Sequence, residues 1–179
     1  MSGLLATLPI HLACQLISPG YHGGINVTLV EDSHVVHEMV SLPSGYTAFP
    51  EIGVAYKYYK NKLTWNVARK QCMSEGASLA VIDSFRKIDY VASLKEKTLA
   101  VHTGIHRLYD NTAEWTDVRT GLPMFFVPWN PTVNPTLRSA LSCTALWADG
   151  SGVGPWNCGT VLPVVCEIPL YGTTRSSDA

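Results

Sequence analysis

Four cysteines between residues 72 and 166 are the side chains of this sequence best suited to covalent chemistry. They are Cys72, Cys143, Cys158 and Cys166. An even number of thiols in a small domain is typical of an oxidised framework of crosslinks, and four cysteines allow three pairings. A Cys72–Cys166 bond would join the two ends of the ordered region, and a Cys143–Cys158 bond would close a local hairpin. We expect two disulfides rather than free thiols.

Zinc binding is the competing chemistry for the same thiols. Structural zinc sites use closely spaced Cys-x-x-Cys pairs or nearby histidines. The sequence contains no such pair, and no histidine lies beside any of the four cysteines. We therefore predict no metal site.

His102 and His106 are the remaining candidates for catalysis. They are four residues apart, but they fall in a predicted strand and turn, so they would not share a helical face. The sequence has no His-Glu-x-x-His, no Gly-x-Ser-x-Gly and no glycine-rich phosphate loop. Cysteines committed to crosslinks are not available as nucleophiles. The protein is predicted not to be an enzyme.

The composition is that of one packed domain. Of the 179 residues, 46% are hydrophobic and 15% are charged, and the formal net charge is −1. A chain of this length forms one full core. Its charge gives no reason to expect a nucleic-acid partner or an acidic membrane surface. No apolar run approaches the roughly 20 residues that a spanning helix needs, so no membrane span is predicted.

Residues 1–50 are predicted to be a leader followed by a flexible arm. The apolar stretch from Leu4 to Ile17 resembles the hydrophobic part of a signal peptide, although no Lys or Arg precedes it. An N-terminal strand is the alternative. Cleavage of a signal peptide would remove the fifth cysteine, Cys14, and Asn26 begins an Asn-Val-Thr glycosylation triplet. These features predict a secreted, extracellular protein.

Apolar periodicity and capping residues predict the elements of an ordered domain over residues 51–168. Strands are expected over residues 54–59, 79–82, 98–105, 114–116, 141–147 and 161–168. One helix should run from the N-cap Thr64 to Gly76, and a second from Ser84 to Lys97. A glycine-rich turn is expected over residues 149–155 and a disordered tail over 169–179. The long loop after Trp129 has little periodicity, and a compact domain keeps such a loop for a function.

The order of motifs over residues 53–168 resembles that of the C-type lectin-like domain. The motifs that carry the resemblance are Trp65 with Ala68, residues 76–82, Gly104-Ile105, Trp115, Gly121, Trp129, Cys143, Trp156-Asn157-Cys158 and Cys166-Glu167. Residues 52–57, 65–69 and 104–106 are most similar to insect hemolymph lipopolysaccharide-binding proteins and immulectins. The resemblance implies an α+β fold with two helices, antiparallel sheets and a long upper loop region. It also implies the disulfides Cys72–Cys166 and Cys143–Cys158.

Sugar-binding members of this family hold a calcium ion in the upper loops, and this sequence departs from their calcium motifs. Asn134-Pro135-Thr136 stands where the family has Glu-Pro-Asn or Gln-Pro-Asp, and no acid occurs in residues 139–142. Asn157 is followed directly by Cys158, where the family has aspartate. Calcium takes six to eight oxygens, several of them charged. We therefore expect the calcium ion to be lost and no cofactor to be present.

Ligand contacts are then expected from side chains of the loops themselves. The predicted ligand-binding residues are Asn134, Thr136, Trp147, Asp149 and Asn157. One hypothesis is a secreted pattern-recognition module that binds microbial carbohydrate or lipopolysaccharide in innate immunity. The alternative is a calcium-independent module that binds another protein, because the same loops offer a variable surface on a rigid base.

Overall fold

The computed structural model describes residues 41–108, 114–136 and 140–170. Cys14, Asn26 and the predicted tail from residue 171 onward lie outside these ranges. The described part contains two α-helices, α1 (Trp65–Ser74) and α2 (Phe85–Leu94), and a short 3-10 helix, η1 (Pro50–Ile52). Its strands are β1 (Thr47–Phe49), β2 (Val54–Leu63), β3 (Ser78–Leu79), β4 (Val101–His106), β5 (Thr116–Asp117), β6 (Cys143–Leu146), β7 (Val153–Trp156) and β8 (Leu162–Pro169).

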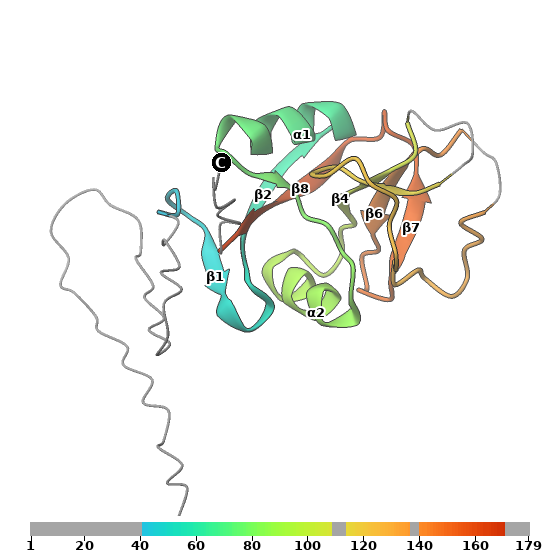
Figure 1. The fold of residues 1–179 in the computed structure, drawn as a ribbon. Coiled ribbons are helices and arrows are strands. Elements are labelled where there is room, and N and C mark those ends of the chain that lie inside the picture. The colour runs from blue at the N-terminus through green and yellow to red at the C-terminus, as the bar shows by residue number, and fades with distance from the viewer. Residues whose placement is uncertain (1–40, 109–113, 137–139, 171–179) are drawn as a thin grey trace, which may run out of the picture.

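These strands form one mixed sheet. The order along it is β1-β2-β8-β4-β6-β7, with β3 paired to β8 and β5 paired to β4. The pairing of β4 with β8 is parallel, and the other strand pairs are antiparallel. β2 and β8 pair from Val54–Pro169 to Leu63–Leu162. Segments close to the two ends of the described domain therefore lie side by side (Figure 1).

The two helices cover opposite faces of the central strands, because successive residues of a strand point to opposite faces. Ala55 and Cys166 belong to the hydrophobic cluster that contains Trp65 of α1. Tyr56 and Val165, one residue before or after them, belong to the cluster that contains the α2 residues Ile88 and Val91. Figure 1 shows α1 and α2 on either side of β2 and β8. The α+β class with two helices is confirmed.

Both predicted disulfides are present. Cys72–Cys166 joins α1 to β8 with a Cα–Cα distance of 5.4 Å. Cys143–Cys158 joins the start of β6 to the segment after β7 with a Cα–Cα distance of 5.1 Å. The first bond fixes a helix to the sheet, and the second fixes the base of the β6–β7 hairpin.

Glu167 follows the first disulfide and is fully buried on the opposite face of β8. Its carboxylate accepts a hydrogen bond from Nη1 of Arg119 at 2.5 Å and lies 3.6 Å from Nζ of Lys87, in α2. Burial raises the pKa of Glu167, while the positive charges of Lys87 and Arg119 act to lower it. A buried carboxylate of this kind needs paired charges, and here they connect β8 to α2 and to the turn after β5.

The folded unit extends beyond the predicted boundaries at both ends. Leu42 and Tyr46 are buried, and β1 pairs with β2, so the packed domain includes residues before 51. β8 ends at Pro169, and the backbone N–H of Leu170 donates to the carbonyl of Gly53.

A helix long and apolar enough to cross a membrane does not occur among the described residues.

Several predicted elements differ from the structure in extent. The second helix ends at Leu94 instead of Lys97, the strand expected over 79–82 is β3 (Ser78–Leu79), and the strand expected over 114–116 is β5 (Thr116–Asp117). The prediction of a turn over 149–155 is wrong in its second half. There Val153–Trp156 forms β7, an edge strand beside β6.

Candidate ligand-binding site

The β6–β7 hairpin carries two of the tryptophans of the chain. Trp156 pairs with Cys143 in the hairpin ladder. The backbone N–H of Trp147 donates to the carbonyl of Gly152 at 3.1 Å. The two indole rings meet edge to face, with centroids 6.4 Å apart and an interplanar angle of 86°. Both residues are half-buried. We call Trp147 and Trp156 the hairpin indole pair.

Gly154 makes the hairpin indole pair possible. A Cβ atom at this position would lie 2.4 Å from Nε1 of Trp147, which is closer than any ordinary contact. The indole of Trp147 therefore occupies the space where β7 lacks a side chain. Nε1 of Trp147 is itself buried and has no hydrogen-bond partner within the described ranges.

Asp149 and Asn157 flank the hairpin indole pair at the two turns that border β7, and both are exposed. Oδ1 of Asp149 accepts hydrogen bonds from the backbone N–H and the hydroxyl of Ser151, at 3.0 and 2.6 Å. These bonds from Ser151 lower the pKa of Asp149, so the carboxylate is charged at neutral pH. Oδ1 of Asn157 accepts from the N–H of Gly159 at 2.8 Å.

Asn134 and Thr136 lie together in the long loop and are also exposed. Oδ1 of Asn134 accepts hydrogen bonds from the N–H and the hydroxyl of Thr136, at 3.1 and 2.7 Å. This is a local turn of the kind that Asn side chains stabilise. The five predicted ligand residues thus come from two segments, the long loop and the β6–β7 hairpin.

Asn130 connects these two segments and was missed by the sequence prediction. Its Oδ1 accepts hydrogen bonds from the N–H and hydroxyl of Thr132, and its Nδ2 donates to the hydroxyl of Ser151 at 2.5 Å. Ser151 in turn donates to Asp149. The Asn130-Pro131 dipeptide is a turn signal in the sequence. That signal marks the turn, but it does not show that the side chain reaches Ser151 in the turn between β6 and β7.

The donor set does not fit a calcium ion. Asp149 supplies one carboxylate, and Asn134 and Asn157 supply two amide oxygens, whereas calcium takes six to eight oxygens. An oxygen of each of these side chains already accepts hydrogen bonds within its own turn. Within the described residues, no cluster of three or more His, Cys, Asp or Glu side chains is placed to hold a metal.

Comparison with known families agrees with this architecture. The sequence model described as "Lectin C-type domain" matches residues 61–168, so the chain belongs to the C-type lectin domain family. Domains of this family are non-enzymatic binding modules, in agreement with the prediction of no enzymatic activity for this domain. The match begins in the last residues of β2 and runs to residue 168 of β8, and it includes the hairpin indole pair and both disulfides.

Relatives with the same domain differ widely in size. The chain is 28% identical over 132 residues to lymphocyte antigen 75 of Mus musculus, a match that covers 72% of this chain and 7% of that protein. It is also 28% identical over 144 residues to the hemolymph lipopolysaccharide-binding protein of Periplaneta americana, covering 73% of this chain and 54% of that protein. The chain therefore spans only part of each of these relatives.

Solved structures show the same fold. A calcium-independent type II antifreeze protein superposes with a TM-score of 0.63 at 20% identity, covering 74% of this chain and 97% of that chain. Human lithostathine superposes with a TM-score of 0.61 at 19% identity, covering 71% and 98%. At these identities the likeness supports the fold, which is that of a C-type lectin domain.

Proposed function

We propose that this domain is a secreted pattern-recognition module that binds microbial carbohydrate or lipopolysaccharide without calcium. The observation that carries the proposal is the hairpin indole pair, flanked by the exposed side chains of Asp149 and Asn157. Aromatic rings with a polar neighbour combine an apolar contact surface with hydrogen bonding. A sugar ring has the matching chemistry, because it presents an apolar face and a rim of hydroxyl groups.

The 28% identity to a hemolymph lipopolysaccharide-binding protein supports a microbial ligand and a secreted protein. The two disulfides are in keeping with an oxidising, extracellular compartment. The poor calcium donor set supports binding through the protein's own side chains. In this proposal Asn134 and Thr136 extend the contact surface from the long loop, which Asn130 connects to the hairpin turn.

A glycan array that includes lipopolysaccharides tests the proposal. Purified protein is applied with calcium and with excess EDTA, and the same glycans should bind equally well in both. Trp156→Ala should weaken binding to those glycans severalfold, and Asn157→Ala should weaken it to a smaller degree. Asn66→Ala, which removes an exposed amide on α1, is the matched control and should bind like the unmodified protein. Binding that disappears with EDTA would show that the loops hold calcium after all.

A calcium-independent protein-binding module is the second candidate. It is favoured by one observation: the polar oxygens of the predicted ligand residues are hydrogen-bonded within their own turns, so fewer are directed outward for sugar hydroxyls. Pull-down from the body fluid that contains the protein, with and without competing sugar, separates the two candidates. A specific protein retained at saturating sugar, together with an array without signal, would favour the second.

Secretion is proposed on the same grounds and has its own test. Intact mass of the protein secreted by eukaryotic cells, measured without reductant, reports the mature N-terminus, the state of the thiols and any glycan at Asn26. A mass that corresponds to residues after the Leu4–Ile17 stretch, with four hydrogens fewer than the reduced chain, is the expected result.

A further inference from the structure

Lys95, the residue that directly follows α2, is buried although it carries a charge. Its Nζ donates hydrogen bonds to three backbone carbonyls, those of Ala148 at 2.5 Å, Leu99 at 3.0 Å and Glu96 at 3.2 Å. An ammonium group has three N–H donors and no acceptor, so three carbonyls match its donors fully. Buried lysines are rare unless they are paired, and here the pairing is with backbone oxygens.

The three carbonyls belong to two separate segments of the chain. Glu96 and Leu99 lie in the connection from α2 to β4, where a cation also complements the negative end of the helix dipole. Ala148 lies 53 positions after Lys95, between β6 and β7. None of the three carbonyls belongs to α2 itself. The ammonium therefore does more than terminate the helix, because it joins the end of α2 to the β6–β7 hairpin.

We call residues 148–151 the hairpin turn. Its first residue, Ala148, stands between Trp147 of the hairpin indole pair and the exposed Asp149. The backbone of Gly150 lies close to α2, since a Cβ atom at this position would be 3.5 Å from Cβ of Ala92. Helix α2 thus contacts the hairpin turn by packing, and Lys95 adds a charged hydrogen bond to the same turn.

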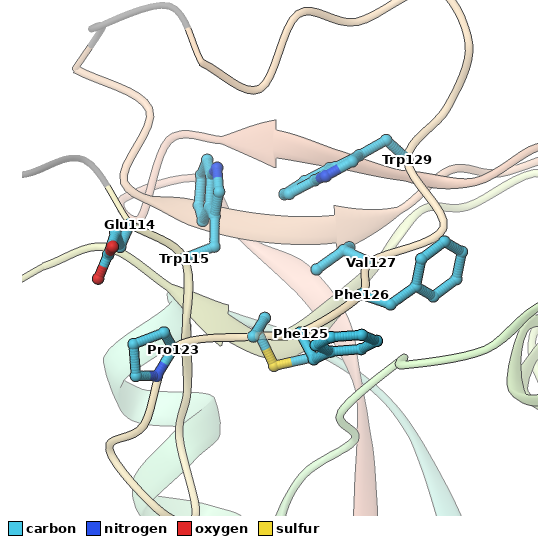
Figure 2. A pocket seen from close by; sticks show the side chains of 8 residues that line it. Glu114, Trp115, Pro123, Phe125, Phe126, Val127 and Trp129 are labelled. Atoms are coloured by element: carbon cyan, nitrogen blue, oxygen red, sulfur yellow. The ribbon is translucent and has the colours of Figure 1, made fainter.

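The long loop holds the hairpin turn through Asn130. Nδ2 of Asn130 donates to the hydroxyl of Ser151, and its backbone N–H donates to the carbonyl of Val153 at 2.8 Å. The preceding residue, Trp129, packs on Trp115 with ring centroids 5.1 Å apart. Figure 2 shows these two indoles beside each other, where both line a pocket. The hairpin turn is therefore anchored by two side chains, one from the long loop and one from the end of α2.

Lys95 is the charged one of the two anchors, and its charge also acts on Asp149. Hydrogen bonds from Ser151 and, to a smaller degree, the charge of Lys95 lower the pKa of Asp149. A turn that is fixed before binding loses less conformational freedom when a ligand arrives. Lys95 thus favours binding at Asp149 in two ways, by fixing the backbone next to it and by keeping its carboxylate ionised.

We infer that Lys95 is a positioning residue of the candidate ligand-binding site. Its ammonium fixes the hairpin turn in the conformation in which Asp149 meets the ligand, although Lys95 itself is buried. The part of this inference that concerns binding rests on the proposed function. The part that concerns the turn is a property of the free protein and has its own measurement.

Hydrogen exchange in the free protein tests the effect on the turn. Lys95→Met keeps a long side chain and removes the donors. Exchange of the backbone N–H groups of Gly150 and Ser151 should become about tenfold faster, while exchange in β2 and β8 stays the same. Lys97→Met, at an exposed lysine of the same connection, is the matched control and should change neither. Unchanged exchange in the turn, or an equal increase in β2 and β8, would refute the inference.

Lys95→Arg is the second variant, for the case that Lys95→Met does not fold. Arginine keeps a charged donor, but its planar fork cannot place one nitrogen against three carbonyls. Exchange should again become faster in the hairpin turn and not in β2 or β8, by a smaller factor. Exchange that is the same as in the unmodified protein throughout the hairpin turn would refute the inference from this variant as well.

Binding is measured on immobilised lipopolysaccharide and on immobilised mannan. On a surface that binds the unmodified protein, Lys95→Met and Asp149→Ala should each weaken binding about tenfold, and Lys97→Met should not. Because Lys95 acts through Asp149, the double variant should bind little worse than Asp149→Ala alone. Additive losses would make Lys95 a general stabilising residue, and an unchanged affinity in either single variant would also overturn the inference. If neither surface binds the unmodified protein, the proposed function fails for these two ligands, and the exchange measurement still decides whether Lys95 fixes the turn.

Discussion

The guanidinium of Arg107 lies over the indole ring of Trp115, with Cζ 4.5 Å from the ring centroid. Both side chains donate a hydrogen bond to one carbonyl oxygen, that of Pro135, from Nη1 of Arg107 at 3.2 Å and Nε1 of Trp115 at 3.0 Å. Nε of Arg107 also donates to the carbonyl of Leu141 at 3.2 Å. One stacked pair that follows β4 and precedes β5 therefore holds both the middle and the end of the long loop.

Arg107→Lys should loosen this loop. Lysine keeps the charge but lacks the planar fork that reaches two carbonyls while stacking on a ring. The expected loss is about 1–2 kcal/mol of unfolding free energy, with faster amide hydrogen exchange in residues 130–136. Arg69→Lys on α1 is the matched control and should leave exchange in the loop unchanged. Equal exchange in both variants would mean that the loop is held mainly by Asn130.

The two disulfides should contribute unequally to stability. Cys72–Cys166 spans a sequence separation of 94 residues and Cys143–Cys158 spans 15. Loop-closure entropy predicts about 4.7 kcal/mol for a 100-residue loop and about 3 kcal/mol for a 15-residue loop. The double variant Cys72→Ala/Cys166→Ala should therefore lose about 1–2 kcal/mol more than Cys143→Ala/Cys158→Ala. Urea unfolding of both variants measures the difference, and the opposite order would rule out an entropic origin.

The fold could be predicted from the sequence because its signals are local or covalent. Thr64 is the N-cap residue of α1, and Gly76, with a φ of 74°, follows its C-cap residue Glu75. Ser84 caps α2 by accepting a hydrogen bond from the backbone N–H of Lys87. The spacing of Trp65, Ala68 and Cys72 correctly places one helical face in the core. The disulfide pairing was expected because it joins the ends of the ordered region, and the family resemblance implied the same pairs.

β7 was not predicted because its composition opposes a strand. Gly154 and Pro155 are both depleted in strands, and a proline cannot donate to a central ladder. β7 lies at the edge of the sheet, where one side needs no donor, so the proline is tolerated. The contacts of Arg107 with Trp115, and of Asn130 with Ser151, were also missed. The residues of each pair lie in different segments, eight positions apart for Arg107 and Trp115 and 21 for Asn130 and Ser151, and no helix or strand periodicity encodes such contacts.

Stability should fall as the pH drops from 7 to 5, in part because of His102. This side chain is fully buried, with Nε2 2.9 Å from the carbonyl of Leu63 and 3.1 Å from that of Thr160. Burial lowers the pKa of His102, although the two carbonyls act to raise it. Its folded pKa is thus below the unfolded value of about 6.5. The unfolded state therefore takes up the proton first, and the stability present above pH 6.5 is lost as the pH falls through this window.

His102→Gln should flatten the pH dependence of the unfolding free energy between pH 7 and 5, measured by urea unfolding at several pH values. His106 also has a pKa lowered by burial and by the charge of Arg69, so His106→Gln should remove a further part of the slope. A slope that neither variant changes would assign the effect to other groups.

Gly154→Ala should displace the indole of Trp147, because the new Cβ would lie 2.4 Å from Nε1. Overpacking of this kind costs about 1–3 kcal/mol of unfolding free energy, and near-ultraviolet circular dichroism should report the changed packing of the two indole rings.

A double-mutant cycle with Trp147→Phe separates the clash from a general effect on β7. Phenylalanine lacks the Nε1 atom that the alanine would meet, so Gly154→Ala should cost clearly less in the Trp147→Phe background. If the loss of unfolding free energy is the same in both backgrounds, Gly154 is required by the backbone of β7 and not by the packing of the indole. If instead Gly154→Ala reduces binding on the glycan array as much as Trp156→Ala does, the edge-to-face geometry itself is required for the ligand.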